Sequence, residues 1–171
     1  GGAFEMLQLW INLPKAHKFT PAKYQSIKHA DKPKVDLPND QGTVYVIAGE
    51  YEGMNGIASA FSPIHMYDMH LNPGADFSFR LPSGFNSGIL VIDGEIKVNG
   101  SKAPENHYVQ LKNEAGKIQI QAEKKSKLMV LSGEPLNEPY VSYGPFVMNT
   151  EQEIKDAIRD YNEGKFGFLA D

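Results

Sequence analysis

Apolar and polar residues alternate along much of the chain with the two-residue period of a half-buried β-strand. The first alternation ends at Pro14 and places four aliphatic residues on one face: Leu7, Leu9, Ile11 and Leu13. Further strands, separated by Gly, Pro, Ser and Asp turn residues, are predicted over residues 44–47, 57–61, 64–71, 89–92, 95–98, 108–111, 117–122 and 128–131. Many short strands with tight turns between them predict an all-β antiparallel sandwich or barrel.

One helix is predicted near the end of the chain. Thr150 is followed three residues later by Glu153, which is the spacing of a capping box. The residues at helical spacing that form one apolar stripe are Ile154, Ala157, Ile158 and Tyr161. Gly164 is well placed to end the helix. Because an isolated helix of about 13 residues is marginal in water, the stripe must pack against another part of the protein.

Residues 14–41 contain four prolines and six lysines and predict a surface connection. The lysines could attract an anionic partner, but Asp31, Asp36 and Asp40 dilute their charge, so a solvated linker is the preferred interpretation.

Composition narrows the possible functions. The 171 residues carry a net charge of −4, which argues against a surface that coats nucleic acid. No cysteine is present, so disulfides, thiolate catalysis and Cys-ligated zinc are excluded, and a reducing compartment, the cytoplasm, is expected. Neither a membrane-spanning apolar run nor a signal-peptide pattern is found, so no membrane partner is expected. The nucleophile-elbow, P-loop and dinucleotide motifs are also absent from the sequence.

Several unusual strings resemble the pirin family of bicupins. They are LQLWINLP at residues 7–14, GEPL at 133–136 and GPFVMNT at 144–150. The resemblance extends from about Leu7 to Phe168 and implies an all-β, cupin-type antiparallel β-barrel or jelly roll with a short C-terminal α-helix. It implies three parts: a strand and linker from the end of an N-terminal cupin (1–41), a C-terminal cupin barrel (42–148), and a capped helix with its tail (149–171).

The same resemblance implies where a metal would be bound. In pirins the metal, usually iron, lies in the N-terminal barrel on three His and one Glu, upstream of the segment that Leu7–Pro14 resembles. The resemblance therefore implies that this chain begins after those ligands, as a fragment of a longer protein. We expect no cofactor in the chain itself, and iron or another divalent metal in the N-terminal cupin that precedes it.

The stretch 71–100 tests whether the second barrel could hold its own metal. Cupins that bind metal resemble the pattern of a Gly, five residues, His-x-His, four residues, a Glu, six residues and a second Gly. When the first Gly of this pattern is placed at Gly74, the two His positions fall on Arg80 and Pro82, and the Glu position falls on Ser87. The closing glycine is Gly94. The later His-x-Glu of the family falls on glutamines, Gln119 and Gln121. Because none of these positions offers a good ligand for iron or zinc, no metal or catalytic residue is assigned.

Three residues remain as pocket candidates: His65, Tyr67 and Arg80. His65 shares its strand parity with Tyr67, which predicts that both point into the barrel, and Arg80 is expected to face the interior from a former ligand position. Together they could bind a small anion or carboxylate, since Arg pairs with such groups bidentately. The preferred alternative is that His65 is a hydrogen-bonded core residue and that Arg80 reaches the rim or pairs with Asp76.

Three functions are compatible with these observations. In the first, the chain is the metal-free C-terminal half of a metal-dependent, quercetin 2,3-dioxygenase-like pirin, and the N-terminal cupin is its partner. In the second, it is a non-enzymatic protein-interaction or transcription-cofactor module. In the third, the protein is a single barrel with a pocket for a small molecule. Without a partner barrel, the apolar faces of residues 7–13 and of the helix predict a dimer or an exchanged N-terminal strand.

Overall fold

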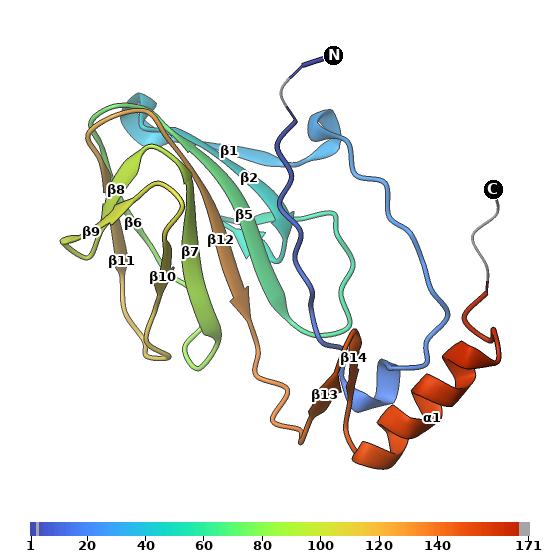
Figure 1. The fold of residues 1–171 in the computed structure, drawn as a ribbon. Helices are drawn as coiled ribbons and strands as arrows, with labels where there is room; N and C mark the ends of the chain where they lie inside the picture. The colour runs from blue at the N-terminus through green and yellow to red at the C-terminus, as the bar shows by residue number, and fades with distance from the viewer. Residues whose placement is uncertain (3, 168–171) are drawn as a thin grey trace. The chain divides into compact units, whose positions relative to one another are not determined.

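The computed structural model describes residues 1–2 and 4–167, which form two compact units (Figure 1). The barrel unit comprises residues 23–135, and the helical unit combines residues 1–22 with the chain from Leu136 onward. Each unit is described by itself. Phe168, the end of the resemblance, and the rest of the predicted tail lie outside the described residues.

The barrel unit is built from twelve strands within the described residues. They are β1 (Lys34–Leu37), β2 (Gly42–Ala48), β3 (Glu50–Tyr51), β4 (Met54–Asn55), β5 (Ile64–Leu71), β6 (Ala75–Phe79), β7 (Asn86–Asp93), β8 (Glu95–Val98), β9 (Ser101–Pro104), β10 (Tyr108–Gln110), β11 (Ile118–Ala122) and β12 (Ser126–Gly133). Two short 3₁₀ turns, His29–Asp31 and Pro38–Asp40, flank β1.

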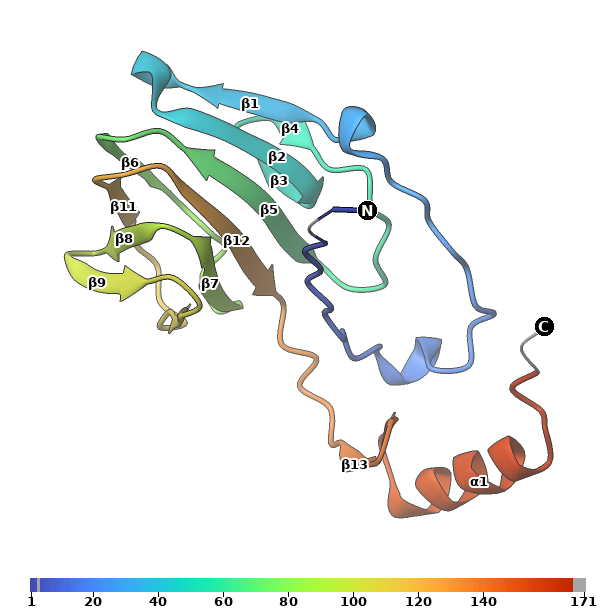
Figure 2. The same cartoon turned by 45° about the horizontal axis from the view of Figure 1, so that its top comes forward.

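The strands form two antiparallel sheets that enclose one core (Figure 2). The larger sheet has the order β1-β2-β5-β12-β7-β10, and the smaller has the order β6-β11-β8-β9. A separate two-stranded hairpin, β3-β4, follows β2. The predicted all-β antiparallel barrel is confirmed.

The core follows directly from the alternation in the sequence. The inward residues of β2, Val44 and Val46, are completely buried, as are Leu128 and Val130 of β12. Tyr67 between them is only 1% exposed. Because each such side chain contributes roughly 1.5–3 kcal/mol when buried, the shared inner face fixes the register of these strands.

Two predicted features of the barrel unit are wrong. Residues 57–61 form no strand: their backbone reaches β2 through isolated bonds, such as the one from the Ala58 N–H to the Ile47 carbonyl, and Phe61 stays half exposed. The expected linker, in turn, contains β1, in which Val35 pairs with Val44. β1 has only four residues, and an alternation this short does not predict a strand.

The helical unit contains the predicted helix, α1 (Glu151–Asn162), and a hairpin of β13 (Val141–Tyr143) and β14 (Phe146–Met148). The capping box is formed: the Glu153 N–H donates to the Thr150 hydroxyl at 3.2 Å, and the Glu153 carboxylate accepts from the Thr150 N–H at 2.9 Å. Ile154 and Ala157 are buried against Met148. The stripe therefore packs within its own unit, and Tyr161, although 64% exposed, meets the ring of Phe146 at 6.5 Å.

The N-terminal segment differs from its prediction. Residues 7–13 are assigned to no strand, and Leu7, Leu9 and Ile11 are 45–48% exposed. Alternation supplies an apolar face, but a strand also needs a neighbour to pair with its backbone, and this segment has none in the part of the chain that the structure describes. A 3₁₀ turn, Lys15–His17, follows Pro14, and its first N–H donates to the Glu138 carboxylate at 2.8 Å.

The structure also bears on membrane insertion. Within residues 1–2 and 4–167, the helices are too short or too polar to cross a bilayer.

Candidate functional site

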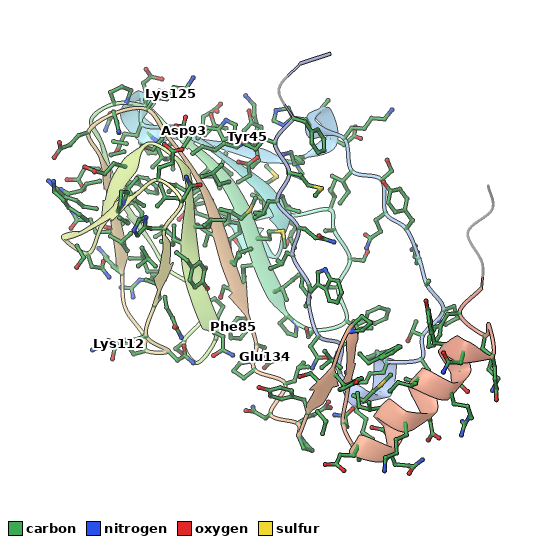
Figure 3. All side chains as sticks on the ribbon, viewed as in Figure 1. Tyr45, Phe85, Asp93, Lys112, Lys125 and Glu134 are labelled. Carbon is green, nitrogen blue, oxygen red and sulfur yellow. The ribbon has the colours of Figure 1, made fainter. Side chains whose placement is uncertain are left out.

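The candidate site lies at one end of the barrel unit, where the connections β6–β7 and β10–β11 come together. Figure 3 shows Phe85 and Lys112 at this end and Asp93 and Lys125 at the opposite one. Two cavities open here, of about 430 Å³ and about 450 Å³. We call this region the open end of the barrel.

A short hydrogen-bonded chain lies beside these cavities. The Tyr67 hydroxyl lies 2.7 Å from Nδ1 of His65 and 2.6 Å from the Glu50 carbonyl. A tyrosine hydroxyl has one hydrogen, so both short contacts are satisfied together when Nδ1 of His65 donates to the hydroxyl and the hydroxyl donates to the carbonyl. The Glu50 N–H lies farther from Nδ1, at 3.4 Å. His65 and Tyr67 are thus brought together, with Glu50 as their third partner.

Aromatic side chains surround this chain. The ring of Tyr67 meets that of Tyr51 edge to face at 5.3 Å, and Tyr51 packs in turn against Phe79 at 6.2 Å. On its other side His65 approaches Phe85 at 6.0 Å. Edge-to-face and tilted contacts at these distances are favourable, so the rings hold the hydrogen-bonded chain in place.

Burial controls the ionisation of the two tyrosines. It raises the pKa of Tyr51 to about 12, with a smaller contribution from Glu52. Burial also raises the pKa of Tyr67 far above its usual range, and Glu50 and Tyr51 add to the shift. Both hydroxyls are therefore neutral near pH 7 and can donate hydrogen bonds, but they cannot act as bases.

Gly49 explains how Glu50 comes so close to His65. Its φ of +76° is a left-handed conformation, and a Cβ placed there would lie 2.5 Å from Nδ1 of His65 and 2.6 Å from the Ile64 carbonyl. Only glycine combines this backbone conformation with this close approach. The position next to the hydrogen-bonded chain therefore cannot carry a side chain.

Arg80 lies elsewhere than expected. Ala75 and Phe79 of β6 are buried, so Arg80 has the outward parity and is exposed. The expectation that it faces the interior is wrong, because Arg80 directly follows the buried Phe79 and therefore lies on the opposite face. Arg80 instead lines the rim cavity of about 450 Å³ together with Glu50, Tyr51 and Lys117. It does not pair with Asp76, whose carboxylate accepts from Gln119 at 2.8 Å and Gln121 at 3.0 Å.

The former ligand positions do not suit a metal. Pro82 has no donor atom, and the Ser87 hydroxyl is bonded to Ser132 at 2.7 Å. Gln119 and Gln121 flank the inward Ile120 and therefore point away from the interior. Residues 1–2 and 4–167 contain no group of three or more His, Asp or Glu side chains that could hold an ion. The donor set at the open end therefore fits neither iron nor zinc.

The geometry favours binding over catalysis. The open end offers hydroxyls, ammonium groups and apolar walls, but no nucleophile with an adjacent base. Glu50, Tyr51 and the lysines at positions 112 and 117 were not singled out from the sequence. Gly49 before Glu50 was the signal that could have revealed the first two, whereas Lys112 lies in a loop without periodicity and Lys117 was predicted only as the first residue of a strand, which begins at Ile118 instead.

Comparisons with known proteins agree with this architecture. The model of the family described as "Pirin C-terminal cupin domain" matches residues 66–167. This chain belongs to the pirin family. It carries the family's C-terminal cupin fold, an antiparallel barrel followed by a short helix.

The pirin relatives include proteins with enzyme names. A Pseudomonas aeruginosa protein with the provisional name quercetin 2,3-dioxygenase is 39% identical over 166 residues, which make up 97% of this chain and 58% of the relative. Human pirin is 37% identical over 168 residues, which make up 95% of this chain and 57% of human pirin. The crystal structure of quercetin 2,3-dioxygenase from Acinetobacter baumannii is similar with a TM-score of 0.89 and 40% identity, covering 94% of this chain and 56% of that one. The chain thus spans under three fifths of each.

Proposed function

We propose that this chain acts as the metal-free C-terminal cupin half of a pirin-like protein whose metal chemistry occurs in a separate N-terminal cupin. The observation that carries the proposal is the donor set at the open end: Arg80 points outward, Pro82 has no donor, and the Ser87 hydroxyl is bonded to Ser132. The greater length of the relatives leaves room for a second barrel.

The activity proposed for the intact protein is quercetin 2,3-dioxygenase-like oxidation with iron or another divalent metal, in the cytoplasm. Two relatives carry that name. When bound in an N-terminal cupin, the metal would supply the oxygen chemistry. In this reading the present chain completes and stabilises the protein, with residues 1–41 as the segment that leads out of the N-terminal cupin.

The test is to assay the longest protein encoded by the gene, loaded with iron, for oxygen-dependent consumption of quercetin. We expect turnover that is lost when His residues upstream of Gly1 are replaced and is retained in Ser87→Ala. Loss of turnover in Ser87→Ala, with the fold intact, would place the chemistry in this barrel and overturn the proposal. Iron-loaded protein that never consumes quercetin would contradict the enzymatic part.

A second function, protein contact without chemistry, is favoured by exposed apolar side chains in the helical unit. Phe4, Trp10 and Tyr140 are each 69–85% exposed, and exposed apolar side chains supply the surface that a protein contact would bury. The partner we propose is the N-terminal cupin, or a second copy of this chain through dimerisation or exchange of the N-terminal segment. Light scattering on the chain alone tests the latter: a clean monomer at high concentration would count against the second copy.

A further inference from the structure

The cavity of about 430 Å³ at the open end is separate from the hydrogen-bonded chain and from any metal chemistry. Its lining is mixed, and the large apolar side chains in it are Leu81, Phe85, Val98, Val109, Leu111 and Ile118. Val98 and Ile118 belong to the buried core, so the floor of the cavity is the core itself. Pockets of this size are typical of sites for small molecules. We call it the core pocket.

The polar side chains of the core pocket include the neutral Ser87, Asn99, Ser101 and Gln110 as well as three charged residues. The Ser87 hydroxyl lies among the lining residues and is held by Ser132, which is 5% exposed. Lys112 and Lys117 line the same pocket, with Glu114 as the only acidic residue among its lining. Neither lysine forms an ion pair with any residue that the structure describes. An apolar floor is thus combined with two ammonium groups that lack a carboxylate partner.

We propose that the core pocket binds a small carboxylate with an apolar body, held by Lys112 and Lys117. The apolar body would replace water over the core residues, which is favourable in proportion to the apolar area covered. The carboxylate would pair with the two lysines in a charge-assisted contact. A phosphate would lack the arginine fork or the array of backbone N–H groups that phosphate sites usually supply, so the carboxylate is favoured.

This proposal does not depend on the proposed function. It requires neither a metal nor a second cupin, so it can be tested on the chain alone and can fail or succeed independently. It also gives the two former ligand positions that line this pocket, Pro82 and Ser87, a role as walls around a ligand.

The experiment uses phenylacetate as the probe and its neutral counterpart, phenylacetamide, as the matched ligand. Each is titrated into the chain while the backbone amide signals are followed by NMR. We expect phenylacetate to shift the amides of Val98, Val109, Leu111 and Ile118, with nuclear Overhauser contacts from its ring to the Leu111 methyl groups. Phenylacetamide should bind about fivefold more weakly, because a partly exposed ion pair is worth on the order of 1 kcal/mol.

The charge contribution is isolated by a double variant, Lys112→Met with Lys117→Met. It should lower the affinity for phenylacetate about fivefold and leave phenylacetamide binding unchanged. The control is Lys124→Met with Lys125→Met, at the opposite end of the barrel, where Figure 3 shows Lys125; it should change neither affinity. All four lysines are exposed, so the fold should be retained, which the dispersion of the amide signals verifies.

Three results would overturn the proposal. One is equal affinity for phenylacetate and phenylacetamide, which would show that the carboxylate charge does not contribute to binding. Another is a set of shifted amides outside the core pocket. The third is the absence of any saturable shift up to about 20 mM phenylacetate, a concentration that would reveal even a weak site.

Discussion

The hydroxyl of Tyr67 donates a 2.6 Å hydrogen bond to the backbone carbonyl of Glu50, and this bond ties β5 to the first strand of the β3-β4 hairpin. The β3-β4 hairpin pairs only two residues of each strand, and so short a pairing contributes little stability by itself. The side chain of a fully buried tyrosine therefore anchors a hairpin that its own ladder could not hold. His65, with Nδ1 2.7 Å from the same hydroxyl, adds a second contact.

Tyr67→Phe should consequently lower the free energy of unfolding by about 1–2 kcal/mol, because the Glu50 carbonyl and His65 lose a partly buried partner while the ring contacts remain. Urea unfolding followed by circular dichroism measures the change. Tyr24→Phe is the control, since Tyr24 is 88% exposed. Equal stability of the two variants would show that the hydroxyl does not anchor the hairpin.

Alkaline titration should reveal two tyrosines that resist ionisation. Of the eight tyrosines, Tyr51 and Tyr67 should stay protonated above pH 10, near which a tyrosine of an unfolded chain ionises, since burial raises the pKa of Tyr51 to about 12 and that of Tyr67 upward as well. Above pH 10 the folded state holds protons that the unfolded state has released. The contribution of the two buried tyrosines to the free energy of unfolding is therefore complete below about pH 10 and is lost as the pH rises further. Phenolate absorbance measured alongside unfolding tests this. Ionisation of all eight below pH 11, with the fold intact, would contradict it.

Gly49→Ala should be far more damaging than Gly53→Ala. Both glycines have positive φ, +76° and +79°, so both substitutions carry the backbone strain of about 1 kcal/mol. Only at Gly49 would the new Cβ meet His65 and the Ile64 carbonyl, whereas nothing lies within 4 Å at Gly53. The clash should add about 1–3 kcal/mol, measurable as an extra fall in the midpoint of urea unfolding. Equal losses would show that the hairpin shifts to accept the methyl group.

Much of the fold could be predicted from the sequence, because its strongest signals are local. The alternation of Tyr67, Met69 and Leu71 with polar residues decided the buried face of β5, and the Thr150–Glu153 spacing located the helix. The strand expected over residues 7–13 failed for the opposite reason. Alternation states which face would be buried, but it cannot supply the neighbouring strand.

The site was harder to predict. The face on which a strand residue lies depends on the register of that strand, and the position of a loop residue depends on tertiary contacts. Arg80 follows the buried Phe79 and lies on the exposed face, which its spacing from Gly74 did not reveal, since neighbouring residues of a strand point to opposite faces. His65 and Tyr67 were placed together correctly by their shared parity. Glu50, in contrast, joins them through backbone atoms, which no pattern of side chains reveals.

Asp76 should show how its glutamine partners control its ionisation. Hydrogen bonds from Gln119 and Gln121 lower the pKa of its carboxyl group. A lowered pKa means that these bonds add stability above the pKa of the unfolded chain, and that this stability is lost as the pH falls through the folded pKa. Gln119→Leu should raise the pKa of Asp76 toward its ordinary value in an NMR titration. Gln110→Leu is the control, and an unmoved pKa in Gln119→Leu would mean that Gln121 alone sets it.

The last prediction concerns the largely buried ion pair between Lys32 and Asp68, whose side chains are 14% and 10% exposed and lie 3.1 Å apart. Asp68 also contacts His70 at 2.9 Å, so it is the centre of the cluster. Lys32→Met leaves this carboxylate with one partner and should cost about 2 kcal/mol or more of unfolding free energy.

The matched control lies two residues away. Lys34 pairs with Asp36 at 3.6 Å, but these side chains are 58% and 67% exposed, so Lys34→Met should cost less than about 0.5 kcal/mol. Combining Lys32→Met with Asp68→Asn should recover part of the loss, because the unpaired charge is then removed. If Lys32→Met and Lys34→Met unfold at the same urea concentration, burial does not strengthen the Lys32–Asp68 pair, and the connection before β1 is held by its backbone alone.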